Sequence, residues 1–137
     1  MNGFVLDVSV TLAWHFEDEA TPEIWALLER LHDEGGIVPG LWPLEVANVL
    51  AVSERRGRSS PTRSAAFVEQ LARLPLEIDG ETGDRALHET LTLARREALT
   101  AYDACYLELA MRRGLPLATT DAALRRAATR LGVALLP

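Results

Sequence analysis

Residues 115–136 read LPLATTDAALRRAATRLGVALL, and this stretch decides the predicted fold. Its first five residues, 115–119, form a short apolar run that is typical of a buried strand. Residues 121–131 then repeat apolar positions at the spacing of an amphipathic helix, and residues 133–136 are a second apolar run. Two strands joined by a helix predict a parallel pair, because a parallel connection must cross from one end of the sheet to the other.

The same alternation extends toward the N-terminus. Short strands are predicted at residues 3–6, 37–39 and 76–78. Amphipathic helices are predicted between them, at residues 9–16, from Pro22 to Gly35, from Pro43 to Gly57, from Pro61 to Leu74, at 82–97 and at 101–113. We see no repeat or linker, so residues 1–137 are expected to form a single domain. The alternation predicts an α/β sandwich, with a parallel sheet covered on both faces.

The composition is that of a globular protein with one core. The chain has 137 residues, of which 48% are hydrophobic and 25% are charged. No apolar run reaches about 18 residues, so no membrane span is predicted. The N-terminus lacks the basic start of a signal peptide, and we therefore expect a cytoplasmic protein. The single cysteine, Cys105, allows no internal disulfide and no cysteine-based zinc site.

All fourteen basic residues are arginines, and the net charge is −6. Without a lysine, the chain can form neither a P-loop phosphate site nor a pyridoxal Schiff base. The acidic balance argues weakly against a nucleic-acid partner, but arginine is the better fork for phosphate. Arginine clusters could form a local basic rim, at residues 55–58, 95–96, 112–113 and 125–126. Residues 55–58 are the best candidate, with a solvated helix end as the alternative.

Four carboxylates stand at the ends of predicted elements. Asp7 and Asp121 directly follow strands, whereas Glu45 and Asp103 lie in the first turns of helices. Each has an ordinary explanation when taken alone, because acidic side chains cap helices and stabilise their first turns. Parallel strands, however, end at one shared edge of the sheet, and the helices that follow strands begin there. We therefore expect the four carboxylates to meet in one cleft.

A cleft with four carboxylates and no lysine is costly unless a cation enters it or the groups stay protonated. Hard divalent cations that prefer oxygen ligands, Mg²⁺ or Mn²⁺, solve this problem. Such a metal lowers the pKa of a bound water and stabilises charge on a leaving oxygen. The pattern therefore favours hydrolysis of phosphodiester bonds.

Four segments of the chain resemble PIN-domain ribonucleases, and in particular the VapC toxins of bacterial toxin–antitoxin pairs. The first segment combines VLDVS at residues 5–9 with AWHF at 13–16. The others are WPLEVANVL at 42–50, LTAYDACYLELA at 99–110 and LATTDAAL at 117–124. These segments follow the order of the family over essentially the whole chain, and all four acidic positions are filled.

The resemblance implies a PIN-like three-layer sandwich, in which a short parallel sheet of four to five strands lies between two layers of helices. It also implies an endoribonuclease that uses Mg²⁺ or Mn²⁺ in an acidic pocket. Asp7 and Asp103 are expected to be the closest metal ligands, with Glu45 and Asp121 completing the pocket. Four further residues are expected to orient these carboxylates or water, namely Ser9, Asn48, Thr119 and Thr120. For Asn48, a plain surface role is the alternative.

The resemblance further implies three partners. These are an RNA substrate, a small VapB-like antitoxin that inhibits by occupying the pocket, and a second copy of the chain in a homodimer, within a possible larger toxin–antitoxin assembly. The alternatives are a catalytically silent PIN-like module that binds a partner protein, and a nuclease that acts on DNA. A haloacid-dehalogenase-like phosphatase is disfavoured, because its second aspartate is replaced by Ser9 and its lysine is missing. A receiver domain fails for the same lack of a lysine.

Overall fold

The computed structural model describes residues 3–137, and its centre is a five-stranded sheet in which every pairing is parallel. The strands are β1 (Phe4–Leu6), β2 (Gly36–Val38), β3 (Leu76–Ile78), β4 (Leu117–Ala118) and β5 (Leu135–Leu136). Their order across the sheet is β3-β2-β1-β4-β5. The first strand therefore lies in the middle of the sheet, and β3 and β5 form its edges.

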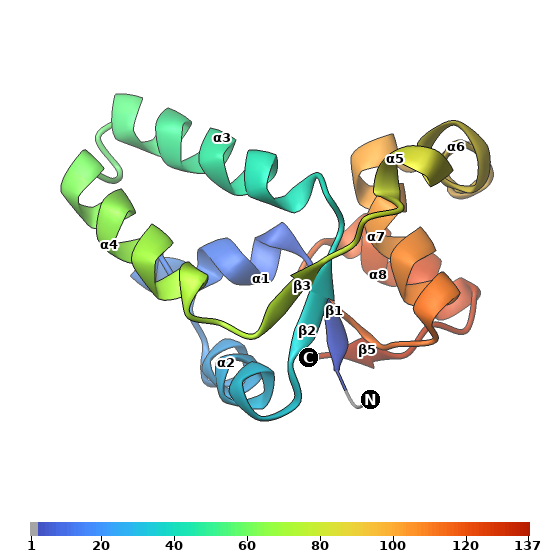
Figure 1. Ribbon diagram of the computed structural model, residues 1–137, viewed down its shortest axis with the longest axis horizontal. Coiled ribbons are helices and arrows are strands. Elements are labelled where there is room, and N and C mark those ends of the chain that lie inside the picture. The colour runs from blue at the N-terminus through green and yellow to red at the C-terminus, as the bar shows by residue number, and fades with distance from the viewer. Residues whose placement is uncertain (1–2) are drawn as a thin grey trace.

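Helices cover both faces of this sheet. One group consists of α1 (Val8–Ala13), the 3-10 turn η1 (Glu17–Glu19), α2 (Pro22–Glu34), α3 (Trp42–Arg55) and α4 (Pro61–Ala72). The other consists of α5 (Thr82–Arg85), the π-helical segment η2 (Ala86–Thr90), α6 (Leu91–Glu97), α7 (Ala101–Arg113) and α8 (Ala122–Arg130). Figure 1 shows α1–α4 on one side of the sheet and α5–α8 on the other. The predicted α/β sandwich is confirmed.

Several helix boundaries follow directly from the sequence. The hydroxyls of Thr21 and Ser60 cap α2 and α4 by accepting from the amides of Ile24 and Arg63. At the other end, α2 stops at Gly35, whose φ of +77° is readily adopted only by glycine. The predicted starts and stops of these helices are therefore correct to within a few residues.

Two expectations differ from the structure. The helix predicted over 82–97 is broken into α5, η2 and α6, because five residues in its middle adopt π-helical geometry. Strands β4 and β5 are also shorter than the apolar runs that predict them, because only two residues of each form ladder pairs. In the described part of the chain, no helix combines the length and the apolar character that a membrane crossing requires.

Helix α7 packs into the core of the protein on several sides. This helix contacts β1 and β4 on one side and α6 and α8 on others. An unbroken run of its residues is consequently buried, from Ala104 to Ala110. Packing on several sides fixes the position of a helix and therefore of its first turn. The first turn of α7 lies at the carboxyl edge of the sheet.

Candidate active site

Asp7 lies at the carboxyl edge of the central strand. Its amide donates to Ala118 O over 3.0 Å, and the register of β1 with β4 brings it beside Thr119. The side chain is only 2% exposed. Its Oδ2 accepts from the hydroxyls of Ser9 (2.6 Å) and Thr119 (2.7 Å). Two of the residues expected to orient carboxylates therefore contact Asp7 directly.

A short network extends this contact along the edge of β4. The amide of Thr120 donates to Ser9 Oγ over 3.0 Å, and the amide of Asp121 donates to Thr119 Oγ1 over 3.0 Å. Only the backbone of Thr120 takes part, because its side chain is exposed and makes no hydrogen bond with residues 3–137. The network fixes the ends of β1 and β4 relative to each other and places Asp121 near Asp7.

The two remaining aspartates lie at helix starts. Asp121 caps α8, with Oδ2 accepting from the amide of Leu124 over 2.9 Å. Asp103 lies in the first turn of α7, where its amide donates to the hydroxyl of Thr100 over 3.1 Å. The predicted cap by Asp121 is present, whereas Thr100 rather than Asp103 caps α7, and the side chain of Asp7 makes no cap hydrogen bond at α1. Both α7 and α8 begin at the edge of the sheet where Asp7 lies. Capping is therefore compatible with a place at this edge.

Glu45 reaches the same edge from the other helical layer. The start of α3 is held by Trp42, whose indole N–H donates to the buried hydroxyl of Thr11 over 3.0 Å. The side chain of Glu45 is half-buried and accepts from the hydroxyl of Tyr106 at Oε1 over 2.6 Å. Asn48, one turn further on, is exposed and makes no side-chain hydrogen bond within the described chain.

Three of the four acids have a raised pKa. Burial, and then the charges of Asp121 and Asp7, raise the pKa of Asp103 to about 6. The pKa of Glu45 is raised by burial and by Asp7 and Asp103, against the hydrogen bond from Tyr106. Burial also raises the pKa of Asp7, more than its two hydroxyl partners lower it. Asp7, Glu45, Asp103 and Asp121, which we call the four-carboxylate site, therefore form one electrostatic unit.

In the part of the chain that the structure describes, no cationic side chain pairs with this unit. Within residues 3–137, none of the ten ion pairs includes a member of the four-carboxylate site. The oxygens do not form a ready-made ligand set either, since no three acidic, histidine or cysteine side chains of this range gather closely enough to hold a metal ion. The donor chemistry nevertheless fits Mg²⁺ or Mn²⁺, because all four groups offer carboxylate oxygen and their charge is uncompensated.

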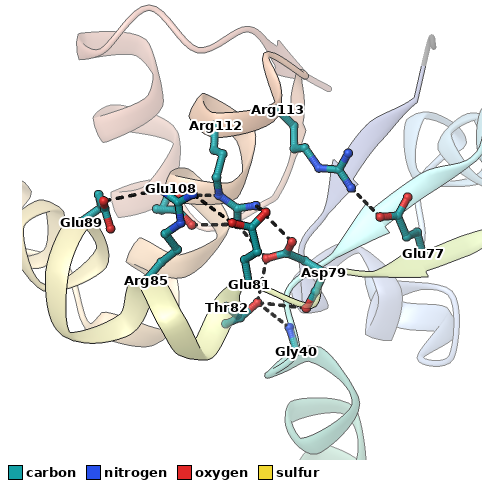
Figure 2. Close-up of polar contacts among 10 residues, drawn as sticks. All are labelled: Gly40, Glu77, Asp79, Glu81, Thr82, Arg85, Glu89, Glu108, Arg112 and Arg113. Carbon is teal, nitrogen blue, oxygen red and sulfur yellow. Dashed lines mark hydrogen bonds and ion pairs between the residues drawn. The ribbon is translucent and has the colours of Figure 1, made fainter.

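A second acidic cluster is paired with an arginine. Arg112 donates to Asp79 Oδ2 over 2.7 Å and to Glu108 Oε2 over 2.8 Å, and its Nη1 contacts Glu81 over 3.3 Å. Figure 2 shows these four residues, which we call the Arg112 network. Thr82 joins the network to the loop before α3, because its hydroxyl donates to Asp79 and accepts from the amide of Gly40. The guanidinium lowers the pKa of Asp79 below its ordinary range.

The arginine clusters are consequently only partly available as a basic rim. Arg112 is committed to the network. Arg58 pairs with Asp18 and Glu19 over 2.8 Å. Arg125 donates to the carbonyls of Thr119 and Leu136. These three guanidinium groups are therefore engaged by acceptors of the protein itself, and a phosphate contact by any of them stays a prediction. Exposed arginines remain at positions 55, 56, 95, 96 and 126.

Two residues near the site are not among the sequence candidates. Tyr106 lies three residues after Asp103 on one face of a helix, and that spacing is the signal by which it could be found. Asp79 directly follows β3, as Asp7 directly follows β1. It meets the same criterion but is paired with arginine.

The protein belongs to the class of parallel α/β sandwiches that carry acidic side chains at the carboxyl edge of the sheet. Within that class, a family model described as "PIN domain" matches residues 4–130. The chain belongs to the PIN-domain family, and the resemblance inferred from its four segments is confirmed. No curated protein matches the chain in sequence.

Solved structures share this fold. PAE2754 from Pyrobaculum aerophilum aligns with a TM-score of 0.67 and 24% identity, over 98% of this chain and 91% of that one. VapBC2 from Rickettsia felis, solved bound to a DNA fragment from its promoter, has a TM-score of 0.66 and 13% identity, over 96% of each chain. FitAcB from Neisseria gonorrhoeae has a TM-score of 0.63 and 17% identity, over 98% and 96%. At these identities the likeness concerns the fold.

Proposed function

We propose that this protein is an endoribonuclease that depends on Mg²⁺ or Mn²⁺ and acts as the toxin of a toxin–antitoxin pair. The observation that carries the proposal is the four-carboxylate site, whose members come from four separate elements and which the described chain leaves without a cationic partner. Membership of the PIN-domain family supports a nuclease. The resemblance to VapC toxins, and the similar folds of VapBC2 and FitAcB, support the toxin role.

Asp7 and Asp103 are proposed as the closest metal ligands, with Glu45 and Asp121 completing the set. A divalent ion held there would activate a water for attack on phosphorus and stabilise charge on the leaving oxygen. The hydroxyls of Ser9 and Thr119 engage Asp7 Oδ2, so Oδ1 has no side-chain donor within residues 3–137. These hydroxyls orient the carboxylate without cancelling its charge. Asn48 and the hydroxyl of Thr120 have no such contact and are proposed only as water-orienting groups.

The proposal includes protein partners. A small VapB-like antitoxin would inhibit the enzyme by covering the four-carboxylate site, and two toxin chains would form a homodimer. Sedimentation of the purified chain tests the dimer. Co-purification with the product of the adjacent reading frame, followed by loss of nuclease activity in the complex, tests the antitoxin.

The central experiment measures cleavage of a broad RNA panel with Mn²⁺ or Mg²⁺. We expect cleavage by the wild-type protein and its loss with EDTA or in Asp7→Asn, whose circular dichroism should match the wild type. Asp33→Asn removes the same charge from an exposed position in α2 and is the matched control. Cleavage by Asp7→Asn at the wild-type rate would refute the site assignment.

Two further outcomes separate the alternatives. Faster cleavage of single-stranded DNA than of RNA would favour a deoxyribonuclease. Absence of cleavage together with absence of Mn²⁺ binding in calorimetry would favour a silent module that only binds a partner protein.

A further inference from the structure

Tyr106 is a buried residue whose polar end lies at the four-carboxylate site. Its ring is fully buried in α7, and its hydroxyl donates to Glu45 Oε1 over 2.6 Å. This bond joins helices from the two opposite layers of the sandwich, α3 and α7.

Glu45 needs such a partner, because electrostatic repulsion and side-chain entropy both oppose its position at the site. Its side chain is only half-buried, and the charges of Asp7 and Asp103 repel its carboxylate. Holding a glutamate in one conformation also opposes its rotamer entropy. We propose that Tyr106 is a positioning residue, which holds Glu45 toward Asp7 and Asp103 and leaves it a single free oxygen for a divalent cation. This inference rests on the proposed function.

The same arrangement recurs at two other acids of the site. Asp7 Oδ2 accepts the hydroxyls of Ser9 and Thr119, and Asp121 Oδ2 accepts the amide of Leu124. In Asp7, Glu45 and Asp121, one carboxylate oxygen thus receives no side-chain donor from residues 3–137. Small octahedral cations such as Mg²⁺ bind carboxylates through single oxygens, whereas Ca²⁺ often takes both. Tyr106 therefore favours the smaller cations over Ca²⁺ at Glu45.

Calorimetric titration of the full chain with Mn²⁺ tests the proposal through a double-mutant cycle. We expect Tyr106→Phe to weaken Mn²⁺ binding about tenfold, as is usual when a partner of a metal ligand is removed. In a Glu45→Gln background the same substitution should have little effect, because Tyr106 acts through Glu45. The ratio of Mn²⁺ to Ca²⁺ affinity should also fall in Tyr106→Phe. A role in packing alone would weaken both backgrounds equally and leave the ratio unchanged.

Tyr102→Phe is the matched control. It removes the hydroxyl of the only other tyrosine, which is 62% exposed in the first turn of α7, and it should bind Mn²⁺ like the wild type. Tyr106→Phe keeps its ring, and thermal melting verifies its fold. The proposal is overturned if Tyr106→Phe binds Mn²⁺ as tightly as the wild type, or if wild-type protein binds Ca²⁺ as tightly as Mn²⁺. If wild-type protein binds no Mn²⁺, the proposed function fails as well. If wild-type protein binds Mn²⁺ and cleaves RNA while Tyr106→Phe binds Mn²⁺ equally tightly, only the positioning role fails.

Discussion

Asp7 and Asp79 occupy equivalent places in the fold but have opposite environments. Each aspartate directly follows a strand, and the register of the parallel sheet aligns the two residues in one row. The amide of Asp7 donates to Ala118 O, and the amide of Asp79 donates to Val38 O. Both side chains are almost completely buried. Asp7 receives two neutral hydroxyls, whereas Asp79 receives the guanidinium of Arg112. Burial raises the pKa of Asp7 although both hydroxyls lower it, whereas the hydrogen bonds from Arg112 lower the pKa of Asp79.

The difference shows what separates a structural acid from a candidate ligand. A hydroxyl satisfies the hydrogen bonds of a buried carboxylate, but it leaves the negative charge in place. A guanidinium supplies both the hydrogen bonds and the opposite charge. The Arg112 network therefore contains a positive charge in direct contact with its carboxylates, whereas no arginine within residues 3–137 pairs with the four-carboxylate site.

The largest expected effect is on catalysis. Asp103→Asn should lower kcat/KM for RNA cleavage by at least about 100-fold, because a proposed ligand and one charge of the site are lost together. Steady-state cleavage at saturating Mn²⁺ measures this. Asp33→Asn should change the rate by less than about twofold. A similar small change in Asp103→Asn would remove the distinction between the two acidic clusters.

This distinction could be predicted from the sequence only in part. The four acids can be found because each stands at a strand end or in a first helical turn. Asp79 satisfies the same rule, and its sequence neighbourhood does not separate it from Asp7. What separates the two is Arg112, 33 residues further along the chain. Its contact depends on the path of α7 across the sheet, which no local pattern specifies.

The same limit applies to finer features of the site. Thr119 could be predicted beside Asp7, because parallel strands ending at one edge bring their following residues together. The bond from Tyr106 to Glu45 depends on how closely two helices from opposite layers approach. The π-helical segment within residues 82–97 could not be predicted either, because the apolar periodicity of an α-helix continues through it.

The second prediction concerns stability. Arg112→Ala should lower the free energy of unfolding by about 3–5 kcal/mol, because Asp79 and Glu108 would remain buried without a countercharge. Arg113→Ala is the matched control, since this neighbouring arginine pairs with Glu77 at the surface and should contribute at most about 1 kcal/mol. Urea unfolding of both variants measures the difference. Equal losses of unfolding free energy in the two variants would mean that the buried ion pairs of Arg112 stabilise the fold no more than the surface pair of Arg113.

The third prediction uses the cation itself. Mn²⁺ at about 100 times its dissociation constant should stabilise the wild-type protein by about 2.7 kcal/mol. Asp103→Asn should lose most of this gain, whereas Arg113→Ala should keep all of it, because only the first removes a proposed ligand. Thermal melting with and without Mn²⁺ provides the measurement. An undiminished gain in Asp103→Asn would place the ion elsewhere.

The smallest effect concerns the stability of the metal-free protein, and its size depends on pH. The folded state holds the proton of Asp103 up to a pKa of about 6, whereas the unfolded chain releases it near the ordinary value of 3.8. The folded state therefore binds more protons between these values, and this group lowers the stability as the pH rises from about 4 to about 6. Asp103→Asn removes this penalty. Since the side chain is partly exposed and solvent screens it, we expect a gain of only about 1 kcal/mol at pH 7.

The gain should vanish near pH 4, where Asp103 is protonated in both states, and urea unfolding in EDTA at the two pH values measures it. Asp79→Asn should behave in the opposite way. Its folded pKa is lowered, so the stability that it contributes is present above the unfolded pKa and is lost as the pH falls through the folded one. The variant should therefore be less stable than the wild type at pH 7. If both substitutions shifted the stability in the same direction at pH 7, neutralisation by Arg112 would not be what separates the two acids.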